Sequence, residues 1–456
     1  MCYTASGVMC TDTAAGDGGD FIIQGDICWS AGPHTLEIKP DSFLVCKEGK
    51  SAGVFERLPR QYADLPLSRC RGKLVIPGLV DLHTHAPQFV YRGLGLDMEL
   101  LEWLESHAFP EEVKYHDIAY AVKAYSFFVE HLKHGPNTRI LVYATVHIPA
   151  TLALMDMMEE SGLISMVGKI NMDRNCPEGL KEGNAAASLS ATKEWLEACA
   201  AHKNTYINTR PILTPRFIPS CSDDLLRGLG ALRRKVNLPI QSHLSENRKE
   251  VEWVKELYPA SEGYGAVYRD FDLLGSAAPE EAAPTVMAHC VWSDEKEINL
   301  LAERGVFVAH CPQSNANLAS GIAPVRRLLD AGVPVGLGSD VAGGTNCSIF
   351  RAMSDAIQVS KLRRTMLNVD DKPLSLEEAF YLGTAGGGAF FGKAGMGYSG
   401  TFAPGADFDA LVINDNALAD PFHLSVRERL EQAINIYDNH LIEAKYVRGK
   451  LVNFSQ

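Results

Sequence analysis

The stretch of sequence that decides the fold is residues 75–85, which read Val75-Ile76-Pro77-Gly78-Leu79-Val80-Asp81-Leu82-His83-Thr84-His85. A run this apolar is typical of a buried strand, and it ends in two imidazoles. His83 and His85 stand two positions apart, so on a strand their side chains point to the same face. Two imidazoles on one face can reach a single metal ion.

Similar apolar runs recur along the chain, and each is followed by a helical or loop segment. Together with residues 75–85 they make eight strand candidates, the others being residues 139–147, 165–173, 206–217, 238–246, 285–291, 306–311 and 333–341. Eight β/α units over roughly 300 residues predict an α/β fold, a (β/α)8 TIM-type barrel. Periodicity alone leaves a doubly wound sheet open as the alternative.

The two ends of the chain have a different pattern, with short apolar runs between Gly, Pro and Asp residues. This pattern is typical of short antiparallel strands. We therefore expect a composite β-sandwich domain formed by residues 1–74 and 390–456, with the barrel domain in residues 75–389. Such an arrangement brings the two ends of the chain together in space.

Composition excludes several classes of protein. The 456 residues are 46% hydrophobic and 22% charged, which excludes a mostly disordered or fibrous chain. The net charge of −13 argues against nucleic acid or an anionic membrane as the main partner. Residues 140–155 are the most apolar long stretch, but they are too short to span a membrane. Eleven cysteines without a CxxC pair, and no secretion signal, predict a cytoplasmic protein with reduced thiols.

The carboxyl ends of the predicted strands carry the polar residues, which are His83, His85, His243, His289 and Asp340. Reactive side chains of a barrel lie at this face. Each residue alone has an ordinary explanation, such as a hydrogen-bonded core histidine or a capping aspartate. Three of these histidines together with the aspartate, at the ends of several strands, instead predict a hydrolytic site for zinc or a similar divalent ion, with one coordination position open.

Residues 75–85 resemble the signature opening of the amidohydrolase superfamily. Finer matches over roughly residues 75–395 resemble the branch of that superfamily that deaminates guanine. The most specific of them are Thr214-Pro215-Arg216-Phe217 and Ser242-His243-Leu244-Ser245-Glu246-Asn247. The HxH pair alone occurs throughout the superfamily and is less specific.

The resemblance implies a zinc-dependent hydrolase that converts guanine to xanthine and ammonia. It implies one Zn²⁺ per subunit, or alternatively Fe²⁺, bound by His83, His85, His243 and Asp340. Hydroxide from water on the ion would attack C2 of the purine. Glu246 would shuttle protons, Asp340 would accept the proton of the water, and His289 would hold that water.

The resemblance also implies a purine pocket whose lining residues are His85, Gln88, Arg216, Phe217, His243, Glu246 and Asp340. The planar donors of Arg216 suit a carbonyl such as O6, the amide of Gln88 can both donate and accept, and Phe217 can stack on the base. The structural alternatives are a salt-bridge role for Arg216 and a core position for Phe217.

Two further expectations follow from the resemblance. Binuclear members of the superfamily carry a carboxylated lysine at the end of strand four, whereas residues 214–217 contain none and Lys169 falls in strand three, so a single ion is expected. The segment Gly135-Pro136-Asn137-Thr138-Arg139 departs from the family's Gly-Thr-Thr run, and we expect it to affect stability rather than chemistry. The resemblance further suggests a homodimer.

Other functions remain as alternatives. A related enzyme could act on another amino-purine, a pterin or a triazine, because the metal centre would be shared and the pocket decides the substrate. A non-catalytic scaffold of the same fold would be expected to lack ligands, whereas the whole set is present here. Zinc deaminases with HxE and PCxxC motifs are excluded, since neither motif occurs.

Overall fold

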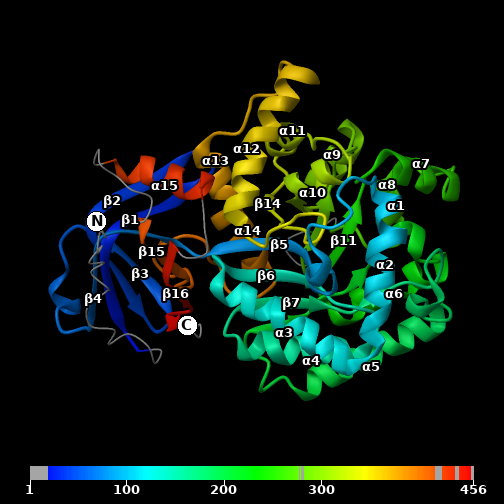
Figure 1. Ribbon diagram of the computed structural model, residues 1–456, viewed down its shortest axis with the longest axis horizontal. Coiled ribbons are helices and arrows are strands. Elements are labelled where there is room, and N and C mark those ends of the chain that lie inside the picture. Colours follow the sequence, from blue (N-terminus) through cyan, green and yellow to red (C-terminus); the bar gives the residue numbers. More distant parts are fainter. Residues whose placement is uncertain (1–18, 277, 279–281, 416–423, 437–440, 453–456) are drawn as a thin grey trace, which may run out of the picture.

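The computed structural model describes residues 19–276, 278, 282–415, 424–436 and 441–452. Two parts lie side by side in it, a sheet-rich part and a larger part in which helices surround strands (Figure 1). Residues 1–18 and 453–456 of the predicted composite domain lie outside the described residues. The mixed α/β fold expected from the sequence is confirmed.

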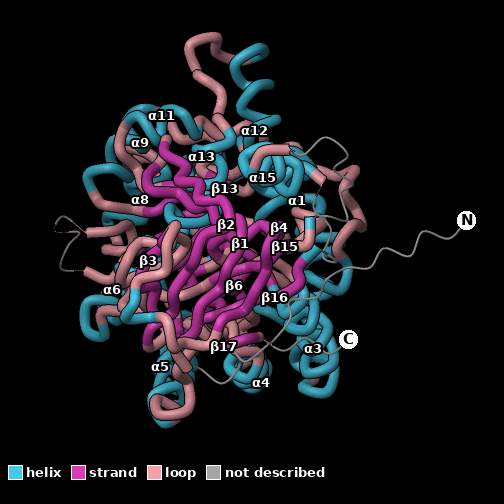
Figure 2. Tube along the Cα trace, turned by 90° about the vertical axis from the view of Figure 1, so that its left-hand side faces the viewer, coloured by secondary structure: helices cyan, strands magenta, loops and turns pink. Residues whose placement is uncertain are grey.

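Both ends of the described chain join one seven-stranded sheet, which faces the viewer in Figure 2. In the order β17-β16-β15-β4-β1-β2-β3 its strands are Lys450–Leu451, Ile442–Val447, Ala410–Ile413, Leu67–Pro77, Phe21–Gly32, Thr35–Lys47 and Lys50–Phe55. β1 and β4 run parallel, and every other pair is antiparallel. The described strands of this part of the molecule all belong to the one sheet, so a sandwich of two sheets remains a prediction.

The larger part contains two four-stranded parallel sheets. The first is formed by β5 (Leu79–His85), β6 (Asn137–Tyr143), β7 (Ile164–Gly168) and β9 (Thr209–Pro211). The second is formed by β11 (Ile240–Leu244), β12 (Thr285–His289), β13 (Phe307–His310) and β14 (Val335–Leu337). The short strands β8 (Ile170–Asn171) and β10 (Thr214–Pro215) pair with each other. A strand therefore overlaps each of the eight predicted ranges, although β6 begins two residues before its range.

Backbone contacts connect the two parallel sheets at both sides. Leu213 and Ile240 form a parallel bridge on one side. On the other side the amide of Asp340 donates to the carbonyl of His83 (2.8 Å), and that of His85 donates to Val341 (3.3 Å). These contacts bring the carboxyl end of β5 next to the turn that follows β14.

Helices cover the outside of the parallel strands (Figure 1). The longer ones are α3 (Ile118–His134), α4 (Ile148–Glu160), α5 (Ala185–Ala201), α6 (Asp223–Val236), α7 (Arg248–Leu257), α9 (Glu295–Glu303) and α12 (Ile349–Met366), whereas α15 (Val426–Asn435) packs against α12 and the seven-stranded sheet. The shorter ones are α8 (Tyr264–Asp270), α10 (Pro312–Asn317), α11 (Val325–Asp330), α13 (Leu376–Tyr381) and α14 (Gly387–Lys393). Between β5 and α3 lie α1 (Leu100–Trp103) and α2 (Phe109–Val113), with single turns around them.

Helix α6 illustrates why these segments are helical. The Ser222 side chain accepts from the amide of Leu225 and caps the first turn. Leucines at helical spacing, among them Leu225 and Leu229, are buried in the same cluster as strand residues such as Ile240. Asn237 ends the helix in the left-handed region, at φ 46°.

The predicted strand at residues 75–85 is in fact two strands that meet at Gly78. Residues up to Pro77 belong to β4 in the seven-stranded sheet, and β5 begins at Leu79. A Cβ atom at Gly78 would lie 2.2 Å from Oγ1 of Thr138, so only glycine fits where the chain passes between the sheets. The apolar run is continuous across this point, which is why its sequence does not reveal the break.

The unusual segment at residues 135–139 is where the two parts dock. Arg139 is fully buried, and its guanidinium donates to Asp409 (2.6 Å) and Asp407 (2.7 Å). It also donates to the carbonyls of Met396 (2.9 Å) and Gly397 (2.7 Å). This contact lies at the start of β6, at the opposite end of the strand from the polar cluster described below.

The expectation of reduced thiols is wrong at one position, because Cys70 is disulfide-bonded. Eight other described cysteines are free, and all of these except Cys176 are buried. A single bridge does not make a disulfide scaffold, since the apolar clusters hold the fold. Within the described residues, no helix combines the length and apolar character needed to cross a bilayer.

Candidate active site

The predicted polar residues converge at the carboxyl ends of the parallel strands. Nε2 of His83 lies 3.2 Å from Oδ1 of Asp340, and Nε2 of His85 lies 3.6 Å from the same oxygen. Nε2 of His85 also lies 3.2 Å from Nε2 of His243. The structure therefore brings together all four residues predicted to bind a metal.

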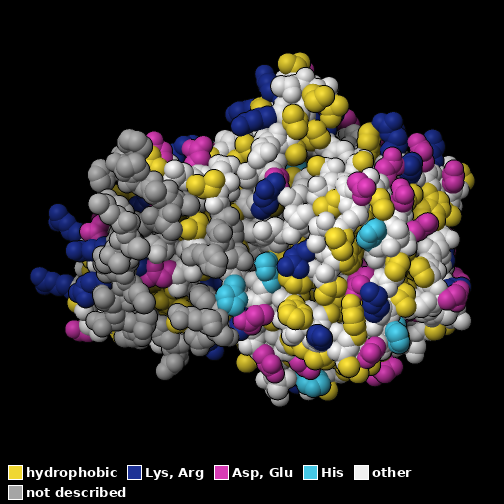
Figure 3. Space-filling view, in the orientation of Figure 1, with side chains coloured by type: hydrophobic (Ala, Val, Ile, Leu, Met, Phe, Trp, Pro, Cys, Tyr) yellow, Lys and Arg dark blue, Asp and Glu magenta, His cyan; other side chains and the backbone are white. Residues whose placement is uncertain are grey.

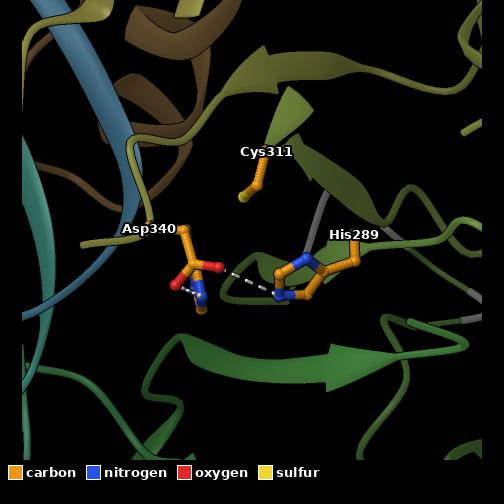
Figure 4. Close-up of side chains that lie close together, drawn as sticks. His289, Cys311 and Asp340 are labelled. Atoms are coloured by element: carbon orange, nitrogen blue, oxygen red, sulfur yellow. Dashed lines mark ion pairs between the residues drawn. The ribbon is translucent and has the colours of Figure 1, made fainter. Parts of the chain in front are cut away.

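His289 and an unpredicted residue, Cys311, complete the cluster. Candidate ligand atoms of His83, His289, Cys311 and Asp340 all lie within 4.8 Å of one another, as do those of His83, His85 and His243. Figure 4 shows His289, Cys311 and Asp340 facing a common space. Cys311 directly follows β13. The other residues of the cluster were predicted from the same kind of position, at the end of a strand. Cys311 was not predicted because a cysteine there is also typical of an apolar core.

A buried carboxylate behind the cluster, that of Asp81, hydrogen-bonds to the backbone at both His83 and Ser339. Oδ1 of Asp81 accepts from the amides of His83 (3.1 Å) and Ser339 (3.0 Å), and Oδ2 accepts from the Ser339 hydroxyl (2.6 Å). The next residue, Asp340, is held in the left-handed region at φ 46°, and His289 at φ 75°. Such conformations are costly for non-glycine residues and concentrate at functional sites.

Hydrogen bonds orient two of the imidazoles. Nδ1 of His243 lies 2.7 Å from the carbonyl oxygen of Arg216, and Nδ1 of His289 lies 2.8 Å from Oδ1 of Asn315. Because each partner is an acceptor, Nδ1 carries the hydrogen and the lone pair of Nε2 faces the cluster. Second partners of this kind are typical of metal-ligating histidines.

The electrostatics of the cluster suit a divalent cation. Burial lowers the pKa of His83, His85 and His243, so their imidazoles are neutral. Burial opposes ionisation of Asp340, but the neighbouring imidazoles, His83 foremost, bring its pKa well below the usual range. Nε2 of His83 and of His289 has no hydrogen-bond partner among the described residues. Neutral imidazoles with free lone pairs beside a carboxylate are the ligand set that zinc takes.

Glu246 stands beside the cluster with its carboxyl group buried. Its Oε2 lies 3.5 Å from Nε2 of His289. Burial raises its pKa well above the usual value, and the nearby charges of Glu250 and Asp340 add to this. The backbone amide of Glu246 donates to Glu250 (3.0 Å), which fixes the turn before α7. A carboxyl group in this state can carry a proton at neutral pH.

A pocket opens onto the cluster. Every residue predicted to bind substrate lines it, namely His85, Gln88, Arg216, Phe217, His243, Glu246 and Asp340. Its apolar wall consists of Leu100, Trp103, Leu104 and Leu318, which were not predicted to bind substrate. Polar donors on one side and a flat apolar wall on the other suit a planar heteroaromatic ligand.

Comparison with known proteins agrees with this geometry. The sequence profile of the amidohydrolase family matches residues 74–452. The chain belongs to the amidohydrolase family.

Relatives of this amidohydrolase confirm the resemblance to the guanine-deaminating branch. The chain is 38% identical to guanine deaminase of Dictyostelium discoideum, over 95% of this chain and 98% of that one. It is 34% identical to guanine deaminase of Homo sapiens, over 94% and 96% of the two chains. Guanine deaminase from C. acetobutylicum, solved with bound guanine in its active site, has a TM-score of 0.89 and 42% identity, over 95% of this chain and all of that one.

The main residue that the sequence did not reveal, Glu112, contacts two of the polar residues that line the pocket. The guanidinium of Arg216 forms a buried, two-pronged ion pair with Glu112 on α2. Glu112 also accepts from Nε2 of Gln88 (2.9 Å). Glu112 stands two residues after Pro110 on α2, and nothing in that spacing indicates a pocket. A carboxylate of this amidohydrolase therefore contacts both residues predicted to read the purine.

Proposed function

We propose that this amidohydrolase deaminates guanine, hydrolysing the bond between C2 and its amino group to give xanthine and ammonia. The observation that carries the proposal is a single pocket that contains the imidazole–carboxylate cluster, Glu246 and the Arg216–Gln88 pair. The guanine deaminases at 34% to 38% identity over nearly the whole chain support it. Hydrolysis of a C–N bond is the reaction class of this branch.

The cofactor in this proposal is one Zn²⁺ per chain, with Fe²⁺ as the alternative ion. His83, His85, His243 and Asp340 would hold it, since their free ligand atoms face one another. When bound, such an ion lowers the pKa of a coordinated water toward ~7 and so supplies hydroxide at neutral pH. Lys169 donates to Glu182 and to the carbonyl of Ile170, which gives it a structural role.

Three residues would move or hold protons during the reaction. Asp340, ionised in the free protein, accepts the proton of the attacking water. His289, whose Nε2 faces both Glu246 and Asp340, orients that water. Glu246 delivers a proton to a ring nitrogen as C2 becomes tetrahedral. Asp340 then passes the proton of the water to the amino nitrogen, the C2–N bond breaks to release ammonia, and the C2 hydroxyl returns a proton to Glu246.

The remaining residues would bind the purine. Arg216 and Gln88 offer N–H donors for O6, and Phe217 lies 6% exposed at the pocket wall, where its ring can contact the base. A buried site that hydrogen-bonds one substrate edge rejects analogues that lack it, because its donors stay unpaired. The donors that bind O6 would therefore favour guanine, which has an oxo group at position 6, over adenine, which has an amino group there.

A substrate panel on the zinc-loaded protein tests the proposal. We expect ammonia release from guanine at a kcat/KM at least 10²-fold above that for adenine, which lacks the oxo edge, and also above that for 8-oxoguanine, cytosine, a pterin or a triazine. A faster reaction with any of these would replace guanine as the substrate. Absence of ammonia from the whole panel, with metal bound, would favour the non-catalytic scaffold.

We further propose a closed (β/α)8 barrel in residues 75–389 and a β-sandwich domain in residues 1–74 and 390–456. The contacts between the two parallel sheets support closure of the barrel. A homodimer and a cytoplasmic location in purine breakdown belong to the same proposal. Exposed apolar side chains at the projecting end of α12 (Figure 3) support self-association, and eight free cysteines support the location. Sedimentation equilibrium tests the homodimer. We expect twice the mass of one chain, and the mass of a single chain would contradict the proposal.

A further inference from the structure

The contacts of Glu112 are unusual because one buried carboxylate receives donors from two residues of the substrate pocket. Its Oε1 accepts from Nε2 of Gln88 (2.9 Å) and from Nη2 of Arg216 (3.0 Å), and its Oε2 accepts from Nη1 of Arg216. These partners lie 24 and 104 residues away in the sequence. The side chains of Glu112 and Arg216 are 2% and 3% exposed, so water does not compete for these bonds.

Stability alone does not explain this ion pair. Desolvating a carboxylate and a guanidinium costs about as much as their attraction returns, and apolar side chains of similar volume often serve equally well. A specific requirement for the positions of Arg216 and Gln88 is a better explanation. The ring of Phe109, also on α2, lies 5.1 Å from the guanidinium and confines it from another side.

Glu112 leaves Arg216 with donors to spare. A guanidinium has five N–H groups, and the two-pronged pair uses one on each Nη. The N–H of Nε and one on each Nη remain for a ligand in the pocket. Because the two-pronged pair fixes the plane of the guanidinium, the directions of the remaining donors are also fixed.

Glu112 also determines which way the Gln88 amide points. The carboxylate can only accept, so the NH₂ group of Gln88 faces Glu112. At the other end, Oε1 of Gln88 accepts from the backbone amide of Ala342 (3.1 Å). One N–H of Gln88 remains for the pocket, beside those of Arg216.

We propose that Glu112 is a positioning residue that determines specificity for a 6-oxopurine, by aligning the free N–H donors of Arg216 and Gln88 with O6. This rests on the proposed deamination of guanine. A substrate with hydrogen at position 6 does not use these donors, and one with an amino group there opposes them with donors of its own. Glu112 thus sets the preference for guanine over 2-aminopurine and 2,6-diaminopurine, all three of which carry the same leaving amino group.

The test compares Glu112→Gln with wild type on these three substrates. The variant keeps the shape of the side chain but faces Arg216 and Gln88 with an NH₂ group, so their alignment is lost. We expect kcat/KM for guanine to fall about 10²-fold, mainly through KM, because small misplacements of binding groups have effects of this size. For 2-aminopurine we expect a change below about 3-fold, so that the selectivity ratio falls more than about 10-fold.

Glu111→Gln is the matched control. Glu111 is the neighbouring acid on α2 and is also buried, but it bonds to Tyr120 and Lys114 and not to the pocket. The ratio of kcat/KM for guanine to kcat/KM for 2-aminopurine in this variant should equal the wild-type ratio. Glu112→Asp keeps the charge and should recover part of the guanine rate, which gives a second measurement if Glu112→Gln folds poorly.

Two results overturn the proposal while wild type still deaminates guanine. One is an equal loss on all three substrates, which would indicate a purely structural role. The other is an unchanged selectivity ratio in a folded, metal-loaded Glu112→Gln protein. A wild type that is inactive on guanine but active on another substrate would instead overturn the proposed function and this inference with it.

Discussion

Nδ1 of His243 lies 2.7 Å from the backbone carbonyl oxygen of Arg216. The residue whose side chain faces the purine pocket therefore also orients an imidazole of the metal cluster, through its main chain. The two roles use different atoms of Arg216, so they can be separated by substitution.

Replacing Arg216 with lysine should impair substrate binding but spare the metal. Lysine keeps a cation beside Glu112 yet lacks the planar donors, so we expect the KM for guanine to rise about 10- to 10²-fold. The carbonyl that orients His243 remains, so elemental analysis should still find about one ion per chain. His243→Ala should lose the ion. Metal loss in the lysine variant would contradict this separation.

Chelation of the metal should destabilise the protein. An ion that binds only the folded chain stabilises it by about 4 kcal/mol when its free concentration is 1,000-fold above Kd. We therefore expect a chelator to lower Tm by several degrees and Zn²⁺ to restore it, as measured by calorimetry. His243→Ala supplies the control, since its Tm should not respond to the chelator. An equal response in both proteins would exclude this site as the cause.

Glu246→Gln should retain the metal but lower kcat by about 10²- to 10⁴-fold, the usual contribution of a general acid. Burial raises the pKa of Glu246, and its protonated form delivers the proton. Wild-type kcat should therefore fall as pH rises through that raised pKa, and this limb should vanish in the variant. Glu252→Gln, an exposed acid on α7, should behave as wild type. Near-normal turnover of Glu246→Gln would refute the assignment.

Removing Arg139 should weaken the whole fold without touching the pocket. The variant Arg139→Met leaves the buried carboxylates of Asp407 and Asp409 without their main partner. Breaking a buried ion pair in this way costs about 3–5 kcal/mol, measurable by urea unfolding. Arg210→Met, at an exposed site on β9, should cost less than about 0.5 kcal/mol. The KM for guanine should be unchanged in both folded variants.

Lys445 should make stability depend on pH. It is fully buried, and burial lowers its pKa to about 7. Between pH 7 and ~10 the folded lysine is neutral while the unfolded one is charged, so unfolding takes up a proton. The free energy of unfolding should therefore rise with pH relative to Lys445→Met, by up to about 1.4 kcal/mol per pH unit. Lys450→Met, at an exposed position on β17, is the control. A difference in unfolding free energy between wild type and Lys445→Met that does not change with pH would contradict the lowered pKa of Lys445.

The sequence predicted the imidazole–carboxylate cluster because of a general property of parallel strands. Their carboxyl ends meet at one face, so His83, His243 and Asp340 could be expected to converge without any knowledge of contacts. Arg216 and Phe217 were found only through the resemblance, because nothing in their spacing indicates a pocket.

Other features could not be predicted, for identifiable reasons. Glu112 lies in the irregular segment after β5, and its partner Arg216 is 104 residues away. No periodic pattern connects the two. The break at Gly78 is hidden because residues on both sides of it are equally apolar. The disulfide at Cys70 was missed because cysteine spacing does not reveal pairing.

The docking of Arg139 has a consequence for biosynthesis. Asp407 and Asp409 are translated 268 and 270 residues after Arg139. Until then the guanidinium has no carboxylate to pair with, and strand β6 cannot reach its final environment. The docking contact therefore cannot form before residues 407–409 have been synthesised, so the two parts of the fold join only after that point.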